Sequence, residues 1–265
     1  MNNDIRVIIV EHDPFSRNWM ALLAARDCRT RVVGEAEDLT DLLPLLKNQS
    51  SRIDLILLDT DIPGEVDCIP LILKETSNSK HPPSILCTGI KPNLHVLNQL
   101  SHPIFKGYVK KGEIQNSLVW AITFAMEGYW VISDSIQALA SSTNFSLPKP
   151  CIVIEGRYIT KNLTEHQANV ARLAFIFSME RHDLANELGI TEDWGYGLVS
   201  AVYEKIGLKE ILSGEFDTSN YFGDNHLLVE LFEKLRKGII SPVKARDMET
   251  LAFHLLTMPE FTELK

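Results

Sequence analysis

Residues 53–59 read Ile-Asp-Leu-Ile-Leu-Leu-Asp, a short apolar run that ends on an acid. Such runs are typical of buried parallel strands, and four more occur in the first half of the chain, at 5–10, 31–34, 84–88 and 107–110. Stretches with apolar residues at helical spacing lie between them, the clearest at 114–125. This alternation predicts a doubly wound α/β domain over residues 1–127, with a five-stranded parallel sheet of the flavodoxin-like kind.

Polar residues follow these predicted strands at the end where each strand finishes. They are Glu11, His12, Asp13, Asp59, Thr88 and Lys111. Ligands of a doubly wound sheet bind outside the carboxyl ends of its strands, so we expect these side chains to converge. Clustered carboxylates suit a hard cation such as Mg²⁺, while a hydroxyl and an ammonium can hold phosphoryl oxygens. The pattern therefore indicates phosphoryl-transfer chemistry.

This set resembles the receiver-domain family across residues 4–127, and LLDTDIPG at 57–64 is similar to the family's phosphoacceptor loop. The resemblance implies that Asp59 accepts a phosphoryl group from a sensor histidine kinase. It implies a switch hydroxyl at Thr88, a switch aromatic at Tyr108 and a phosphate-contacting lysine at Lys111. The Mg²⁺ ligands that it implies come from Glu11, His12, Asp13 and Asp61.

The sequence departs from the family in its acidic pair. Receivers usually carry two adjacent acids after the first strand, whereas here Glu11 is followed by His12, and neutral imidazole is a poor Mg²⁺ ligand. Asp13 would replace it only if the backbone shifted by one residue. We favour phosphorylation of Asp59; the alternative is an acid retained in a domain that is switched in another way or not at all. Two further alternatives to the functional roles remain. Lys111 is then a solvated surface charge, and Tyr108 is a packed aromatic.

The second half of the chain is predicted to be helical. Residues 128–160 contain Ser-rich and Pro-rich stretches and predict a linker, whose GYWVIS start resembles the beginning of an interdomain linker. Residues 161–265 follow, with helices expected from Thr164, over 184–188 and over 192–206, and a tight turn at 189–191.

These helices resemble the LuxR-type helix-turn-helix domain over residues 163–240. The likeness depends on LT at 163–164, LANELGIT at 184–191 and KIGL at 205–208. Residues 227–240 resemble the family's fourth helix. An insertion at about 209–225 and a C-terminal extension, with a further helix at about 248–257, are departures. The resemblance implies DNA as a partner.

The third helix is where this family reads DNA. The positions implied to contact DNA or a partner are Asp193, Trp194, Tyr196, Gly197 and Ser200. Residues 192–206 hold one lysine and three acids, and residues 151–265 hold 12 basic and 18 acidic residues, so we expect few phosphate contacts. Trp194 and Tyr196 are equally compatible with contact to a protein partner and with burial against the insertion.

We therefore predict a response regulator, or an atypical one, that controls transcription through its C-terminal helix-turn-helix. The alternative is a pseudo-response regulator that acts as a protein-interaction module without binding DNA. A P-loop and a Ser/His/Asp or Cys/His arrangement are both missing from the sequence, so we do not expect an enzyme.

A homodimer is also expected, either through the last helix and strand of the receiver or through an apolar stripe. The stripe comprises Leu228, Leu231, Phe232, Leu235 and Ile239. The alternative is that this stripe packs on the C-terminal helix, on Leu251, Leu255 and Leu256.

Composition limits the remaining classes. Apolar residues make up 45% and charged residues 23% of the 265 residues, as in ordinary globular proteins, and the net charge is −9. There is neither a signal-peptide pattern nor an apolar stretch approaching the ~20 residues that span a bilayer. The four cysteines are scattered, which favours reduced thiols. We expect a cytoplasmic protein with no membrane partner.

Overall fold

The computed structural model describes residues 4–47, 52–62, 68–76, 81–158, 163–213, 225–238 and 245–264, together with residues 215, 217 and 222. The chain divides into two compact units. The first comprises residues 1–25, 29–158 and 259–265, and the second comprises residues 26–28 and 159–258.

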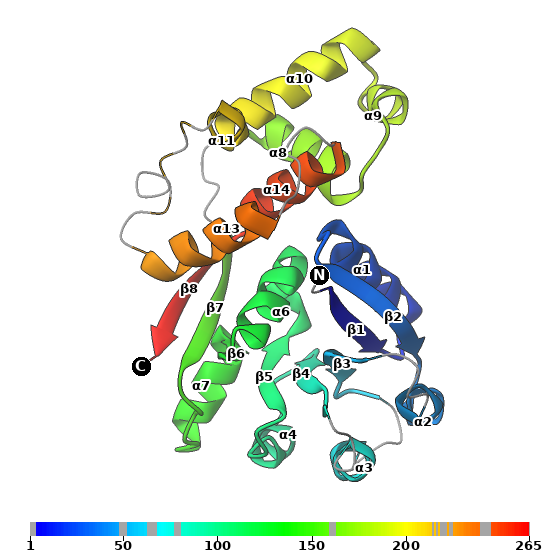
Figure 1. Ribbon diagram of the computed structural model, residues 1–265, viewed down its shortest axis with the longest axis vertical. Coiled ribbons are helices and arrows are strands. Elements are labelled where there is room, and N and C mark those ends of the chain that lie inside the picture. Colours follow the sequence, from blue (N-terminus) through cyan, green and yellow to red (C-terminus); the bar gives the residue numbers. More distant parts are fainter. Residues whose placement is uncertain are drawn as a thin grey trace. The chain divides into compact units, whose positions relative to one another are not determined.

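The first unit is built on one eight-stranded sheet with the order β2-β1-β3-β4-β5-β6-β7-β8 (Figure 1). Its strands are β1 (Ile5–Val10), β2 (Thr30–Ala36), β3 (Leu55–Asp59), β4 (Ser84–Gly89), β5 (Phe105–Lys110), β6 (Trp130–Ser133), β7 (Cys151–Tyr158) and β8 (Pro259–Leu264). The first five strands are parallel in the order 2-1-3-4-5, the flavodoxin-like arrangement that the sequence predicts.

The sheet is larger than the five strands expected. β6 pairs in parallel with β5 and β7 in parallel with β6, while β8 closes the edge antiparallel to β7. Residues 128–160, expected to be a linker, thus contain two strands of the sheet, with α7 (Asp134–Ser142) as the crossover between β6 and β7. The apolar runs of these strands are short and lie between Ser-rich and Pro-rich segments, which is why the local pattern resembles a linker.

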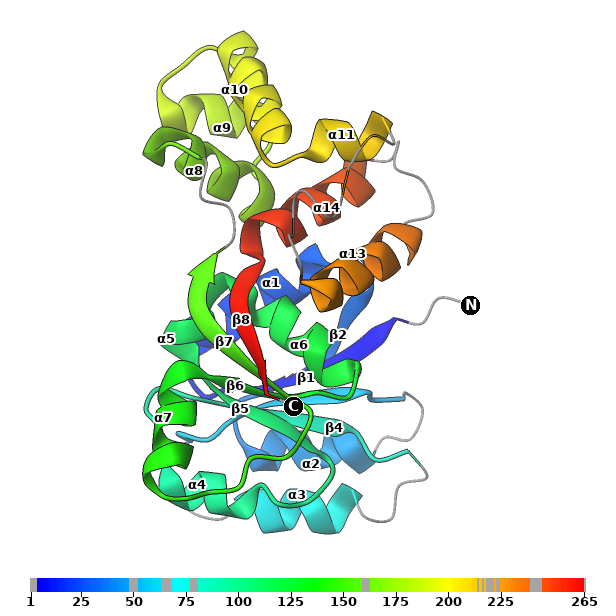
Figure 2. The same cartoon turned by 90° about the vertical axis from the view of Figure 1, so that its left-hand side faces the viewer.

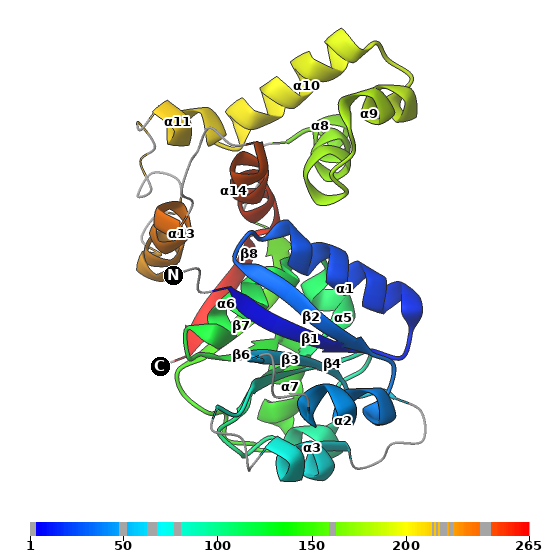
Figure 3. The same cartoon turned by 45° about the vertical axis from the view of Figure 1, so that its right-hand side comes forward.

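Helices cover both faces of this sheet, as a parallel sheet requires (Figures 2 and 3). α1 (Pro14–Arg26), α5 (Lys111–Ile114) and α6 (Leu118–Met126) lie on one face, with the short helix η1 (Gln115–Ser117) between the last two. α2 (Leu39–Lys47), α3 (Cys68–Thr76), α4 (Leu94–Gln99) and α7 lie on the other. Every residue of β3 is buried, so the strand that ends on Asp59 lies in the centre of the core.

Gly107 allows β5 and β6 to approach each other. Its φ is +147°, and a Cβ built there would lie 1.8 Å from the carbonyl oxygen of Val131 in β6. Only glycine fits both this conformation and this spacing. The glycine therefore permits the additional strands to extend the sheet.

The second unit is helical. Its helices are α8 (Glu165–Ala171), the π-helical turn η2 (Arg172–Ile176), α9 (Arg181–Leu188), α10 (Glu192–Lys205), α11 (Leu208–Ser213), α13 (His226–Gly238) and α14 (Ala245–Thr257). Thr164 caps α8 in a capping box with Gln167, Gly189 ends α9 at φ +63°, and Thr191 caps α10. The three-helix arrangement expected for a helix-turn-helix is confirmed. α11 occupies the start of the expected insertion, and 8 of the 17 residues at 209–225 lie outside the described residues.

Both surfaces expected to form a dimer are buried within the chain. On α13, Leu228, Leu231, Phe232 and Leu235 are each at most 2% exposed, while Ile239 lies outside the described residues. Residues Leu118–Ala125 of α6 are buried, and β6 covers the edge of β5.

Among the described helices, none is both long enough and apolar enough to cross a membrane.

Candidate functional site

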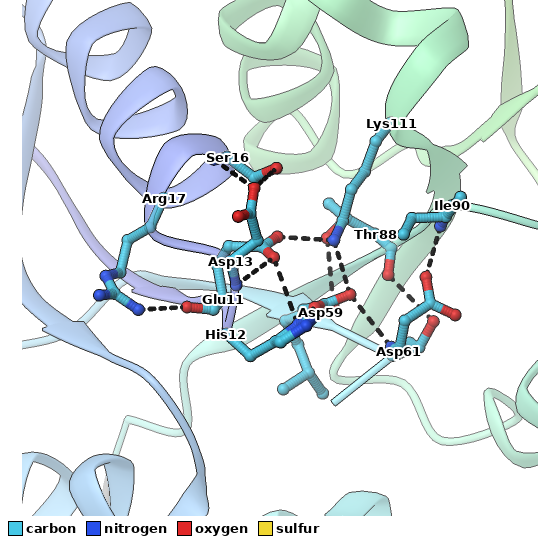
Figure 4. Close-up of polar contacts among 12 residues, drawn as sticks. Glu11, His12, Asp13, Ser16, Arg17, Asp59, Asp61, Thr88, Ile90 and Lys111 are labelled. Atoms are coloured by element: carbon cyan, nitrogen blue, oxygen red, sulfur yellow. Dashed lines mark hydrogen bonds and ion pairs between the residues drawn. The ribbon is translucent and has the colours of Figure 1, made fainter. Parts of the chain in front are cut away.

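The carboxyl ends of β1, β3, β4 and β5 meet at one edge of the sheet (Figure 4). Glu11 follows β1, Asp59 ends β3 beside Thr88 of β4, and Lys111 begins α5 directly after β5. Glu11 and Asp59 are fully buried, and Thr88 is 1% exposed. The parallel topology therefore brings together Glu11, Asp59, Thr88 and Lys111, four of the residues that the sequence predicts to meet.

Lys111 bridges the two buried carboxylates. Its Nζ lies 2.7 Å from Oε2 of Glu11 and 2.8 Å from Oδ1 of Asp59, and its side chain is only 14% exposed. Charge-assisted contacts this short compensate for part of the cost of burying two anions. Lys111 is thus part of the buried centre, and it is not the solvated surface charge that the alternative interpretation proposed.

His12 faces the other oxygen of each carboxylate. Its Nδ1 lies 3.1 Å from Oδ2 of Asp59 and 3.8 Å from Oε1 of Glu11. Figure 4 shows the imidazole and the Lys111 ammonium reaching the carboxylates of Glu11 and Asp59 from separate directions. The His12 side chain is 34% exposed, so it forms the solvent side of this centre.

Burial and ion pairing have opposite effects on the pKa values of these groups. Burial alone would raise the pKa of Asp59, but hydrogen bonds from Lys111 and from the backbone N–H of Asp61 hold it below its ordinary value. Burial raises the pKa of Glu11 despite its hydrogen bond with Lys111. Burial would lower the pKa of Lys111, yet its contacts with both carboxylates raise it. Asp59 is therefore the more firmly ionised carboxylate of the two.

The carboxylates of Asp13 and Asp61 do not join this centre, although the backbone N–H of Asp13 donates to Oε1 of Glu11 at 3.2 Å. Oδ2 of Asp13 accepts hydrogen bonds from the backbone N–H and the hydroxyl of Ser16, at 2.8 and 2.7 Å, and so it caps the start of α1. These bonds also lower the pKa of Asp13. Oδ2 of Asp61 accepts the backbone N–H of Ile90. Of the four residues implied as Mg²⁺ ligands, only Glu11 and His12 lie with Asp59.

Thr88 and Tyr108 are linked through a residue that the sequence analysis did not select. The Thr88 hydroxyl donates to the carbonyl oxygen of Leu58 at 3.5 Å. The backbone N–H and the hydroxyl of Thr60 both donate to the carbonyl oxygen of Thr88, at 2.9 and 3.0 Å, and the Thr60 hydroxyl also lies 3.5 Å from the Tyr108 hydroxyl. The only feature of the sequence that points to Thr60 is its position directly after Asp59.

Tyr108 itself is fully buried. Its hydroxyl donates to the carbonyl oxygen of Lys91 at 3.0 Å, and burial raises its pKa to about 12. The ring is packed in the core while its hydroxyl lies in a polar network beside the site.

The donor set can be compared with what Mg²⁺ requires. Glu11, His12 and Asp59 each offer a ligand atom, and these atoms lie within 4.8 Å of one another. Mg²⁺ prefers oxygen ligands in near-octahedral geometry. Here one donor is an imidazole, and Lys111 already engages one oxygen of each carboxylate. The residues present therefore do not fit a Mg²⁺ site.

A second candidate surface lies on α10 of the second unit. Trp194 is 61% exposed and Tyr196 is 55% exposed, so neither is buried against the insertion. The guanidinium of Arg181 lies 5.6 Å from the centroid of the Tyr196 ring, within cation–π range. Asp193, Gly197 and Ser200, the other expected contact positions, are also exposed.

The charge of this surface differs from that of an ordinary DNA-reading helix. Glu192 and Asp193 stand exposed in its first turn, and Glu192 pairs with His182 at 2.8 Å. Among arginines elsewhere in the unit, Arg236 pairs with Glu233 at 2.9 Å, and Arg181 stacks on Tyr196. The exposed face of α10 is therefore aromatic and acidic, with Lys205 at its far end.

No family model and no curated protein sequence matches the chain. Solved structures do match it. A complex of the two-component response regulator RcsB with DNA is 20% identical, covering 84% of this chain and all of that one, with a TM-score of 0.46. The isolated receiver domain of RcsB from Salmonella enterica serovar Typhimurium is 24% identical over 52% of this chain and 99% of its own, with a TM-score of 0.45.

The response regulator ChrA of a heme-sensing two-component system is also similar. It is 20% identical over 77% of this chain and 91% of its own, with a TM-score of 0.39. These matched structures are response regulators, the class whose motifs both halves of this sequence resemble.

Proposed function

We propose that this chain is an atypical response regulator that controls transcription through its helix-turn-helix. The observation that carries the proposal is the buried centre of Glu11, Asp59 and Lys111 at the carboxyl edge of a sheet with the order 2-1-3-4-5. The same chain contains a capped helix-turn-helix in a separate compact unit. An input centre and an output unit are the two parts that such a regulator needs.

In this proposal Asp59 is the phosphoacceptor. Its ionised carboxylate would attack the phosphorus of a phosphohistidine on a sensor kinase, and the bond from phosphorus to the histidine nitrogen would break with its electron pair on nitrogen. The Lys111 ammonium lies 2.8 Å from Oδ1 of Asp59 and can neutralise a phosphoryl oxygen. His12 stands on the solvent side, in the path of an incoming phosphoryl group. We therefore expect slow transfer.

The output in this proposal is DNA binding by α10. A helix-turn-helix places its second helix in the major groove, which would bring Trp194, Tyr196 and Ser200 toward base edges. The acidic first turn of α10 limits phosphate contacts, so shape and base contacts would carry more of the specificity than charge does. A homodimer belongs to the proposal as well.

A second candidate function is favoured by one observation. Trp194 and Tyr196 stand exposed beside Glu192 and Asp193, and exposed aromatics are common anchors of protein interfaces. In this alternative the chain is a pseudo-response regulator whose α10 binds a protein with a basic, partly apolar surface.

A salt titration of DNA binding separates the two functions. Full-length protein is the material of choice, because a fragment of residues 151–265 would take β7 and β8 out of the sheet. Each neutralised phosphate adds about −0.9 to the log–log slope, so one to three contacts give a slope of about −1 to −3. Binding to genomic fragments with that slope, lost in a Trp194→Ala/Tyr196→Ala variant, would support DNA control.

The opposite outcomes are equally clear. An absence of binding to genomic and random fragments at low salt would favour the interaction module. A steep slope that the double variant leaves unchanged would place the DNA-binding surface outside α10. An Asn98→Ala variant, changed at an exposed position of α4 in the first unit, serves as the control.

A further inference from the structure

We propose that His12 Nδ1, Glu11 Oε1 and Asp59 Oδ2 form a three-ligand site for a borderline divalent transition-metal ion such as Zn²⁺. The site replaces the Mg²⁺ site that the receiver resemblance implies. It does not depend on the proposed function, because it concerns metal binding by the first unit and requires neither phosphorylation nor DNA.

The geometry assigns each carboxylate two roles. Lys111 contacts Oε2 of Glu11 and Oδ1 of Asp59, at 2.7 and 2.8 Å. The remaining oxygens, Oε1 of Glu11 and Oδ2 of Asp59, are the ones nearest to Nδ1 of His12, at 3.8 and 3.1 Å. The ammonium and the imidazole therefore do not compete for the same oxygens, and a metal on the His12 side would leave the Lys111 contacts in place.

The three donor atoms lie within 4.8 Å of one another, and the two distances from His12 can be compared with those of a small tetrahedral ion. Bonds of about 2.0–2.2 Å to nitrogen and oxygen ligands place tetrahedral ligands about 3.3 Å apart. The distance from His12 to Asp59 is already close to that value, and the distance from His12 to Glu11 needs to shorten by about 0.5 Å. His12 is 34% exposed and can make this adjustment, which also leaves a fourth position on the solvent side for water.

The donor chemistry selects the class of metal. Imidazole with two carboxylates is a donor set that Zn²⁺ and its neighbours in the first transition row bind readily. Mg²⁺ dehydrates reluctantly and prefers oxygen ligands. Glu11, Asp59 and Lys111 together carry one negative charge when all three are ionised, enough to attract a divalent cation into a buried centre. His12 thus decides which ion binds.

The test is a calorimetric titration of the full chain with Zn²⁺ and, separately, with Mg²⁺. One equivalent of Zn²⁺ should bind, and Mg²⁺ at the same concentration should not. His12→Ala should lose at least about tenfold in Zn²⁺ affinity, the smallest loss usual even for an outer partner of a metal site. His12→Asp should also weaken Zn²⁺ binding and should gain Mg²⁺ binding, because it restores an oxygen ligand. His95→Ala, changed at an exposed histidine on α4, should bind Zn²⁺ as the unmodified chain does.

Titration with Co²⁺ identifies the donors directly. Visible bands without a thiolate charge-transfer band would support nitrogen and oxygen ligands. A thiolate band would overturn the proposal, because it would place the ion at a cysteine such as the half-buried Cys28. The proposal would also be overturned by a failure to bind Zn²⁺, by Zn²⁺ affinity that His12→Ala leaves unchanged, or by Mg²⁺ binding as tight as Zn²⁺ binding.

Discussion

Replacing Lys111 with methionine should destabilise the first unit strongly near neutral pH. Lys111 is the ammonium in contact with both Glu11 and Asp59, which are fully buried. Methionine fills similar volume but leaves the two carboxylates facing each other without a cation. The loss therefore comes from two buried charges that lose their partner and is not caused by a cavity.

The size of the effect follows from burial. Removing one partner of a buried ion pair typically costs about 3–5 kcal/mol, because the remaining charge stays desolvated. Lys111 is 14% exposed, so solvent screens its contacts little. Protonation limits the cost, since a carboxylate without its partner can take up a proton, and each unit of pKa shift corresponds to about 1.4 kcal/mol. We expect a loss of about 3–5 kcal/mol in the free energy of unfolding at pH 7.

The loss should depend on pH. In the unmodified chain Asp59 has a lowered pKa, so its contribution is present above the pKa of the unfolded state and declines as pH falls through the folded-state pKa. In Lys111→Met the cation is gone, and burial then raises the pKa of both carboxylates. They gain protons in the folded state as pH falls, which relieves the repulsion. The difference between the two proteins should therefore be smaller at pH 5 than at pH 7.

Urea unfolding followed by tryptophan fluorescence measures this difference. Trp120 and Trp130 are buried in the first unit and report on it. Lys110→Met is the matched control, because Lys110 pairs with Glu113 at 3.1 Å and is 34% exposed, and such pairs contribute about 1 kcal/mol or less. A Lys111→Met protein as stable as the control at pH 7, or a difference that grows toward pH 5, would refute this account of the buried centre.

Gly107→Ala should unfold or aggregate the first unit, at a cost above about 4 kcal/mol in the free energy of unfolding, because its Cβ would meet the Val131 carbonyl. Gly112→Ala is the control. A Cβ at that position meets nothing, so the variant should fold normally in the same urea titration. Thr164→Ala should lower the free energy of unfolding of the second unit by about 1 kcal/mol through loss of the capping box, and a change below about 0.3 kcal/mol in thermal unfolding would contradict it. Acetyl phosphate with Mg²⁺ should label the unmodified chain slowly and His12→Asp faster, with no label on Asp59→Asn; rapid labelling of the unmodified chain would show that His12 is no obstacle.

Much of the site could be predicted from the sequence, because its parts are local. An apolar strand that ends on an acid can be recognised from a few neighbouring residues, and parallel strands then bring Glu11, Asp59 and Thr88 to one edge. The helix caps at Thr164 and Thr191 also follow from short-range hydrogen bonds.

The roles of neighbouring carboxylates could not be read in the same way. Asp13 lies two residues from Glu11, yet its carboxylate caps α1, and Asp61 lies two residues from Asp59, yet it accepts the N–H of Ile90. Both residues lie past the ends of their strands, where the regular alternation of side-chain directions stops, and sequence spacing alone does not show which backbone N–H groups lie nearby.

The extent of the sheet was decided by tertiary structure alone. β8 pairs with β7 after an intervening helical unit, with Val153 opposite Thr262. Local patterns do not reveal such a pairing, because it depends on which unpaired strand edge the returning chain reaches. By itself the sequence determined the core strands, their acidic ends and the helix-turn-helix, since each depends on residues close together in the chain. The three additional strands, and the division of the carboxylate oxygens between Lys111 and His12, depend on contacts between distant segments, and only folding brings those segments together.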